Sequence, residues 1–97
     1  MDPIEILEKL KALPSLASAS FYHRTTFECH RTDKQGQDQV VTVTILDAGP
    51  GAGRPRYHCE ATTPDGRSAT GNPDDSLQVL LATVHWWELD KPPNKEG

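Results

Sequence analysis

The sequence predicts an α+β domain with two layers, in which an antiparallel meander of three or four strands packs on an N-terminal and a C-terminal helix. Two segments with apolar residues at helical spacing, 2–13 and 71–89, lie near the two ends of the chain. Between them, β-branched and alternating runs are separated by glycine- and proline-rich turns. Strands bounded by helices are typical of this class, so we expect one domain over 1–90 and a disordered polar tail over 91–97.

The first predicted helix covers residues 2–13. Asp2 can cap its first turn, Pro3 suits the first helical position, and Glu5 adds an acid near the positive end of the helix dipole. Pro14 ends the segment, and a short linker follows. One side of the helix carries an apolar stripe that must dock on another surface, because an isolated helix this short is marginal in water. The stripe consists of Ile6, Leu7, Leu10 and Leu13.

Three strands are predicted at residues 20–32, 39–46 and 56–62, and a short fourth strand at 67–70. Neighbouring residues of a strand point to opposite faces of the sheet, so each strand has an inner and an outer set of side chains. The residues expected on the inner face, with the helices, are Cys29, Val41, Val43, Ile45, Tyr57, Cys59 and Ala61. The residues expected on the open face are Tyr22, Arg24, Glu28, His30, Arg56, His58 and Glu60, with several threonines.

The last helix is predicted over residues 72–89. Asn72 is a favourable cap, and Pro73 fits the first helical position. Asp74 and Asp75 bring negative charge to the helix N-terminus. The apolar arc is wider than a surface helix needs, which indicates either two covering elements or a partner. One stripe consists of Leu77, Leu80, Leu81, Val84 and Trp87, and a second of Val79, Ala82 and Trp86.

Trp86 and Trp87 are adjacent in this helix, so their side chains point about 100° apart around its axis. We expect Trp87, which continues the first stripe, to lie in the core. Trp86 is then either covered by the first helix or exposed as an anchor for a partner.

Charge is distributed unevenly along the chain, whose formal net charge is −4. Residues 71–97 contain two lysines against five acidic residues, which argues against nonspecific binding of nucleic acid by the last helix. The N-terminus lacks the apolar core of a signal peptide, and no apolar run is long enough to span a membrane. We therefore expect a cytoplasmic protein with no membrane partner and with both cysteines reduced.

Two adjacent cysteine–histidine pairs, Cys29-His30 and His58-Cys59, are the first candidates for a metal site or for nucleophilic catalysis. In strands the two members of each pair point to opposite faces, and the strand at 39–46 separates the pairs. Four ligands would therefore not converge on one ion. The glycine-rich segment GPGAG lacks the lysine and the serine or threonine of a phosphate loop. We predict no metal, no cofactor and no enzymatic activity.

Gly49-Pro50 before a strand, Tyr57 within it and Gly71 before the last helix follow a rhythm that resembles the double-stranded-RNA-binding domain. The resemblance implies the order helix, three strands, helix. That family holds phosphates with lysines at the start of its last helix, where this chain has Asp74 and Asp75. The resemblance thus implies the fold, and the two acids argue against RNA binding by that surface.

Residues 66–89, GRSATGNPDDSLQVLLATVHWWEL, also resemble the HicB-type antitoxin domain. In that family a hairpin ends in a small-residue, glycine-containing turn and enters a helix with spaced apolar residues. The resemblance implies a protein partner, since such domains bind a toxin.

The first function hypothesis is a small non-enzymatic protein-interaction module, antitoxin-like or inhibitor-like, with a protein partner. Its candidate binding residues are Tyr22, Arg24, Arg54, Arg56, His58 and Trp86. The second is a nucleic-acid-binding domain, because interleaved arginine and aromatic side chains can contact single strands by charge and stacking. The third is a phage-type inhibitor that mimics nucleic-acid charge through the acidic C-terminal third. A homodimer stays open in each case.

Overall fold

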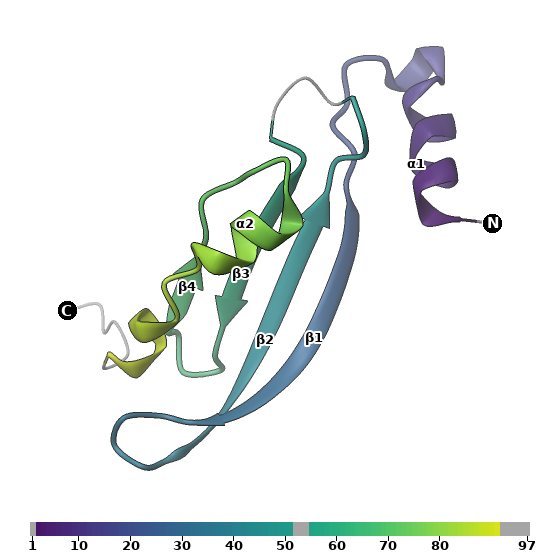
Figure 1. Ribbon diagram of the computed structural model, residues 1–97. Coiled ribbons are helices and arrows are strands. Elements are labelled where there is room, and N and C mark those ends of the chain that lie inside the picture. Colours follow the sequence, from purple (N-terminus) through teal and green to yellow (C-terminus); the bar gives the residue numbers. More distant parts are fainter. Residues whose placement is uncertain (1, 52–54, 92–97) are drawn as a thin grey trace.

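A four-stranded antiparallel sheet with the strand order β1-β2-β3-β4 organises the chain (Figure 1). It is seen in a computed structural model, which describes residues 2–51 and 55–91. The strands are β1 (His23–Thr32), β2 (Asp38–Asp47), β3 (Tyr57–Thr62) and β4 (Ser68–Thr70). The helices are α1 (Pro3–Lys11) and α2 (Leu77–Ala82), and the 3-10 turns are η1 (Pro14–Leu16) and η2 (Trp86–Asp90). The α+β class and the predicted order of the elements are confirmed. The predicted tail lies, from residue 92 on, outside the described residues.

Two tight hairpins of the same type connect β1 to β2 and β3 to β4. In the first, the Asp33 N–H donates to the Gln37 carbonyl, and in the second the Thr63 N–H donates to the Arg67 carbonyl. Each loop ends in a glycine with positive φ, Gly36 or Gly66, a conformation that side chains other than glycine rarely adopt. The turn signals in the sequence therefore set the register of both hairpins.

The strand register sorts the side chains onto two faces, as the alternation in the sequence predicts. Cys29 lies opposite Val41 on β2, and Cys59 lies opposite Ile45. Directly opposite residues share a face of the sheet, so both cysteines point toward the α2 side. The buried core on that face is formed by Val41, Cys59, Ala61, Ala69, Leu80, Val84 and Leu89.

Helix α2 starts at Leu77, four residues later than Pro73, the predicted first helical residue, which corrects the N-terminus of the last helix. The Tyr57 and Asp74 backbones exchange hydrogen bonds of 3.0 and 3.2 Å, so the segment before α2 is extended beside β3. Ser76 caps the helix instead, its hydroxyl accepting from the Val79 N–H. Asp74 accepts from the Ser76 N–H, and thus fixes the turn rather than a helix dipole.

Helix α2 ends at Ala82, so the single helix predicted to Leu89 is wrong. The Thr83 hydroxyl donates to the Leu80 carbonyl and accepts from the Asn72 N–H, which closes the last turn against the segment before the helix. The chain then continues as η2 beside β4, with the His85 N–H on the Thr70 carbonyl. With this break in the helix, the Leu89 side chain is fully buried in the core.

Helix α1 lies beyond the end of the sheet rather than on its face (Figure 1). Its Asp2 cap accepts from the Ile4 N–H, as the sequence predicts. Leu7 is its buried residue, and the Lys11 ammonium donates to the Ala48 carbonyl. At Gly49 a Cβ would come 2.9 Å from Leu7, so only glycine lets α1 approach this loop closely. The molecule is consequently elongated, with extents of 50 × 30 × 24 Å.

A network of polar side chains holds η2 against the tips of both hairpins. The Leu89 carbonyl accepts from Gln39 at 2.9 Å and from Arg67 at 3.0 Å. Arg67 also pairs with the buried Asp33 at 3.4 Å, which links the second hairpin turn to the first. Buried carbonyls and carboxylates need such partners, because an unsatisfied polar group in the interior is costly. The network thus compensates for the shortness of α2.

Asp33 and Asp90 are the acidic members of this network. Hydrogen bonds from the Gln37 and Gln35 N–H groups and from Arg67 lower the pKa of Asp33, against the opposing effect of burial. The pKa of Asp90 is lowered mainly by its hydrogen bond from Arg31, with which it forms an ion pair of 3.1 Å. Both carboxylates are therefore easier to ionise in the folded chain than in the unfolded one.

Stability is expected to fall in acid for this reason. A carboxylate whose pKa is lowered by folding stabilises the fold above its unfolded pKa of about 3.9, and the stabilisation is lost as the pH drops toward its folded pKa. The free energy of unfolding, measured by urea titration monitored by circular dichroism, should decrease below about pH 4. In Asp33→Asn the decrease should be shallower. Equal stability of the wild type at pH 7 and pH 3 would contradict this account.

Candidate functional site

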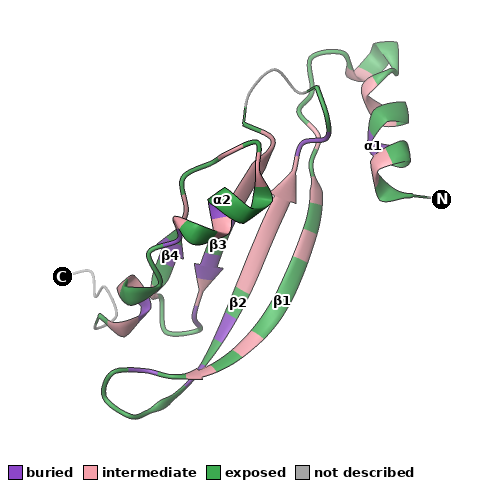
Figure 2. Ribbon diagram, in the orientation of Figure 1, coloured by how far each residue is buried: buried purple, intermediate pink, exposed green. Residues whose placement is uncertain are grey.

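The open face of the sheet is the side away from α2, and its side chains form rows across the strands. One row consists of Arg24, Leu46 and His58. The next consists of Thr26, Thr44, Glu60 and Thr70. No described helix packs on this face. Four members of the two rows, Arg24, Thr26, Glu60 and Thr70, are exposed, and Thr44, Leu46 and His58 are intermediate in exposure (Figure 2).

A groove of about 430 Å³ crosses this face between β2, β3 and the segment after β4. We call it the sheet-face groove. The residues that line it are Arg24, Thr44, Leu46, His58, Cys59, Glu60, Thr70, Gly71 and Pro73. The lining combines the apolar Leu46 with the hydroxyls of Thr44 and Thr70 and with the opposite charges of Arg24 and Glu60. Apolar contact area with a few polar groups is the usual composition of a binding recess.

His58 is the most unusual residue in the groove. Its Nε2 atom is buried and has no hydrogen-bond partner among the described residues. The ring of Tyr22 packs edge-on against it, with the ring centroids 5.9 Å apart. Buried ring nitrogens are normally hydrogen-bonded, so this unpartnered nitrogen is a local energetic cost beside the groove.

Arg24 lies on the open face, on strand β1. Among the described residues its guanidinium forms no ion pair, whereas Arg31, Arg56 and Arg67 each pair with a carboxylate. A free arginine can form two parallel hydrogen bonds to a carboxylate or a phosphate. Of the arginines in the described ranges, Arg24 is thus the one available for recognition.

Arg56 was expected on the open face, but the structure commits it elsewhere. Its guanidinium donates to both carboxylate oxygens of Asp47, at 2.7 and 3.1 Å, and lies 4.8 Å from the Tyr57 ring centroid. Burial is the largest single influence and raises the pKa of Asp47. The hydrogen bonds from Arg56 and from the Gly49 N–H, together with the charge of Arg56, outweigh burial, so the pKa is lowered. The sequence could not show this pairing, because it joins two residues that the register brings together. Arg54 lies outside the described residues.

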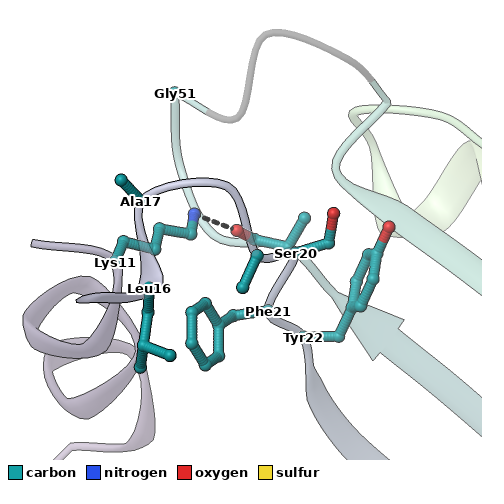
Figure 3. A pocket seen from close by; sticks show the side chains of 9 residues that line it. Lys11, Leu16, Ala17, Ser20, Phe21, Tyr22 and Gly51 are labelled. Carbon is teal, nitrogen blue, oxygen red and sulfur yellow. Dashed lines mark hydrogen bonds between the residues drawn. The ribbon is translucent and has the colours of Figure 1, made fainter. Parts of the chain in front are cut away.

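A second recess, of about 270 Å³, lies between α1 and the start of β1 (Figure 3). The Lys11 ammonium closes one side by its bond to the Ala48 carbonyl, and the Phe21 ring faces Leu16 across the recess. Tyr22 lines this recess and also contacts His58 of the sheet-face groove. It therefore forms a boundary between the two recesses. We treat this second recess as structural, because Lys11, its one charged side chain, is already bonded.

The two tryptophans lie on η2, away from the sheet-face groove. Trp87 was expected in the core, but it is 51% exposed, stacked on His85 and within 4.5 Å of the Lys91 ammonium. Trp86 is 37% exposed and does not lie under α1, which is at the opposite end of the molecule. Leu89 occupies the core position instead, because the helix break changes which residues face the sheet.

The cysteine–histidine pairs lie as the strand parity predicts. Cys29 and Cys59 are on the α2 side and both are free thiols, whereas His30 and His58 are on the open face. Within residues 2–51 and 55–91, no three histidine, cysteine, aspartate or glutamate side chains are grouped so that they could hold a metal ion. Burial, and secondarily the charge of Glu60, raises the pKa of the Cys59 thiol.

Of the predicted site residues, the structure brings together Tyr22, Arg24 and His58, and separates Arg56 and Trp86 from them. Leu46 and Thr44 were not predicted as site residues. Thr44 is one of the threonines expected on the open face, but the recess itself depends on the Gly71–Pro73 segment, which lies beside β3. Such tertiary proximity leaves no local signal.

No family model, no curated protein and no solved structure matches the chain. The resemblances to the double-stranded-RNA-binding domain and to the HicB-type antitoxin domain therefore stay predictions. Neither of the helices in the described part of the chain has the length and apolar character that crossing a bilayer requires.

The two thiols are expected to react at different rates in the folded protein. A thiol reacts as the thiolate, and Cys59 is both buried and raised in pKa, whereas Cys29 is only half-buried. Alkylation with iodoacetamide, followed by mass spectrometry, should modify Cys29 at least about tenfold faster. In Cys29→Ser the fast phase should disappear. The burial of Cys59 would be contradicted if both thiols were alkylated at the same rate in the folded protein and if unfolding in urea changed neither rate.

Proposed function

We propose that the chain is a small protein-interaction domain that binds a partner protein through the sheet-face groove. The observation that carries the proposal is a recess on the open face whose lining combines the apolar Leu46 with Arg24, an arginine with no ion pair among the described residues. The buried Nε2 of His58 would gain a partner group only if the packing around its ring, which includes Tyr22, opened. An antitoxin-like or inhibitor-like role fits a domain of this size that recognises another protein.

The lining of the groove indicates which partner segment it fits. Arg24 favours a carboxylate, Glu60 favours a hydrogen-bond donor or a cation, and Leu46 favours an apolar group between them. A segment that carries an acid, an apolar residue and a donor would match these three positions. The shallow recess suits side chains of an extended segment better than a whole helix.

The tryptophans on η2 offer a second contact area. Trp86 and Trp87 expose large aromatic surfaces, and tryptophan is enriched among the residues that dominate binding energy at interfaces. They lie near the hairpin tips and so are separated from the groove. We propose them as a secondary contact for a partner that extends beyond the sheet.

Nucleic-acid binding is less well supported by the described residues. Phosphate recognition needs several free cations close together, and three of the arginines are committed to carboxylates. The acids at residues 71–91, the described part of the C-terminal third, are committed too: Asp74 and Asp75 accept backbone N–H groups, Asp90 pairs with Arg31, and Glu88 with Lys91. Mimicry of nucleic-acid charge is therefore also less well supported.

Blocking the groove should abolish partner binding. In Thr44→Arg a long cationic side chain would fill the recess beside Arg24, whereas Thr42→Arg places the same side chain on the same face of β2 outside the groove. Affinity capture from the native host, with quantitative mass spectrometry, should show partners retained by wild type and Thr42→Arg but depleted about tenfold or more by Thr44→Arg. Both variants are first checked by urea unfolding. An identical set of bound proteins on all three baits would refute the groove.

Labelled single- and double-stranded RNA and DNA are expected to show no binding at low salt. With Arg24 as the one arginine without an ion pair in the described ranges, the counterion release that drives nonspecific binding would be small. Fluorescence anisotropy at two salt concentrations measures this directly. Micromolar binding that weakens steeply with salt would replace the protein-interaction proposal by the nucleic-acid one.

A further inference from the structure

Strand β1 is a free edge of the sheet and extends over His23–Thr32 (Figure 1). Its pairing with β2 is continuous over the whole strand, without a bulge and without a proline. Natural proteins usually blunt edge strands by such features, because a long flat edge pairs readily with another chain. β1 therefore has the geometry of a strand that can accept a neighbour.

The backbone groups on this edge can be assigned from the hairpin geometry. The Asp33 N–H donates to the Gln37 carbonyl, so these two residues form a hydrogen-bonded pair. In an antiparallel ladder such pairs alternate with non-bonded ones, hence the odd-numbered residues of β1 bond to β2. The even-numbered residues direct their N–H and C=O groups outward. They are Arg24, Thr26, Glu28, His30 and Thr32.

The opposite edge of the sheet does not offer such a template. β4 covers only Ser68–Thr70, and the His85 N–H already bonds to the Thr70 carbonyl. η2 packs along the same strand. The contrast between a covered short edge and a bare long edge points to β1 as the edge that pairs.

We propose that β1 pairs with β1 of a second copy of this chain, antiparallel and centred on Thr26, so that two sheets join into one. This register sets Arg24 of each copy opposite Glu28 of the other on the open face, which gives two ion pairs of opposite charge. One oxygen of Glu28 contacts the His30 Nε2 of its own strand at 2.5 Å, so Arg24 would approach the other oxygen. A centre at Phe27 would set Arg24 opposite His30, and a centre at Glu28 would set two carboxylates together. Charge complementarity therefore selects both the partner and the register.

The inner face of β1 gains contact in the same register. Phe27 is 55% exposed in one copy, because α2 lies over β3 and leaves β1 uncovered. Around a centre at Thr26 the two Phe27 rings are diagonal neighbours, a spacing that aromatic side chains can bridge. About six backbone hydrogen bonds would form between Thr26 and Thr26 and between Arg24 and Glu28. This interface is distinct from the sheet-face groove, because backbone groups along the β1 edge form its hydrogen bonds.

Proline at the centre of the edge tests this interface. Thr26→Pro removes an N–H that points outward, and proline is tolerated on an edge strand at such positions. Analytical ultracentrifugation of the purified chain should show a monomer–dimer equilibrium between low micromolar and submillimolar concentration, which Thr26→Pro abolishes. Urea unfolding of the variant at low concentration checks that the monomer is folded. A wild type that stays monomeric at submillimolar concentration overturns the proposal.

Charge reversal tests the register. Arg24→Glu alone, and Glu28→Arg alone, each place like charges opposite one another, and each should weaken dimerisation about tenfold or more. The double variant restores opposite charges and should recover the wild-type dimer.

The Thr26 and Glu28 amides should also gain hydrogen-exchange protection on dimerisation. A dimer that is insensitive to Thr26→Pro, or that the double variant fails to restore, overturns the proposal. The readout is the purified chain alone, so it is separate from partner binding in the groove.

Discussion

The backbone hydrogen bonds between Tyr57 and Asp74 determine how much of the sheet the C-terminal segment can cover. They keep the residues before Ser76 extended beside β3, so only a short stretch is left for α2 and η2. That stretch covers β3 and β4, and Leu80 and Leu89 are fully buried there. The uncovered half of the sheet, with Phe27 exposed, is thus a consequence of this bridge. The polar bonds to the Leu89 carbonyl then hold the short segment in place.

The parts of the fold that could be predicted are those that local sequence determines. Turn residues with positive φ, such as Gly36 and Gly66, fix both hairpins, and period-two alternation assigns the faces of every strand. The Asp2-Pro3 start of α1 depends on adjacent residues alone. The presence of Arg24 and His58 on one face followed from the same alternation. These signals need no information about distant contacts.

The parts that could not be predicted depend on residues far apart in the chain. Asn72 was the predicted helix cap, but the bridge to β3 holds it in the extended segment and Ser76 caps the helix instead. The helix also ends after Ala82, where Thr83 bonds to the Leu80 carbonyl and the Asn72 N–H, and Trp87 is exposed rather than in the core. Arg56 likewise leaves the open face because the register brings Asp47 beside it. In each case a tertiary contact overrides a local preference.

A single sheet with one bare edge and one open face relates the two proposed interactions to each other. When two copies join edge to edge in one continuous sheet, the two-fold axis is perpendicular to the sheet, so their open faces lie on the same side. Both grooves would then face the same partner surface, and each Arg24 guanidinium, which has several N–H donors, would lie between Glu28 of the other copy and the acid of the recognised segment. A partner carrying two copies of the recognised segment would gain from the high effective concentration of the second groove. Affinity for such a partner would therefore depend on β1 pairing even though no edge residue other than Arg24 lines the groove.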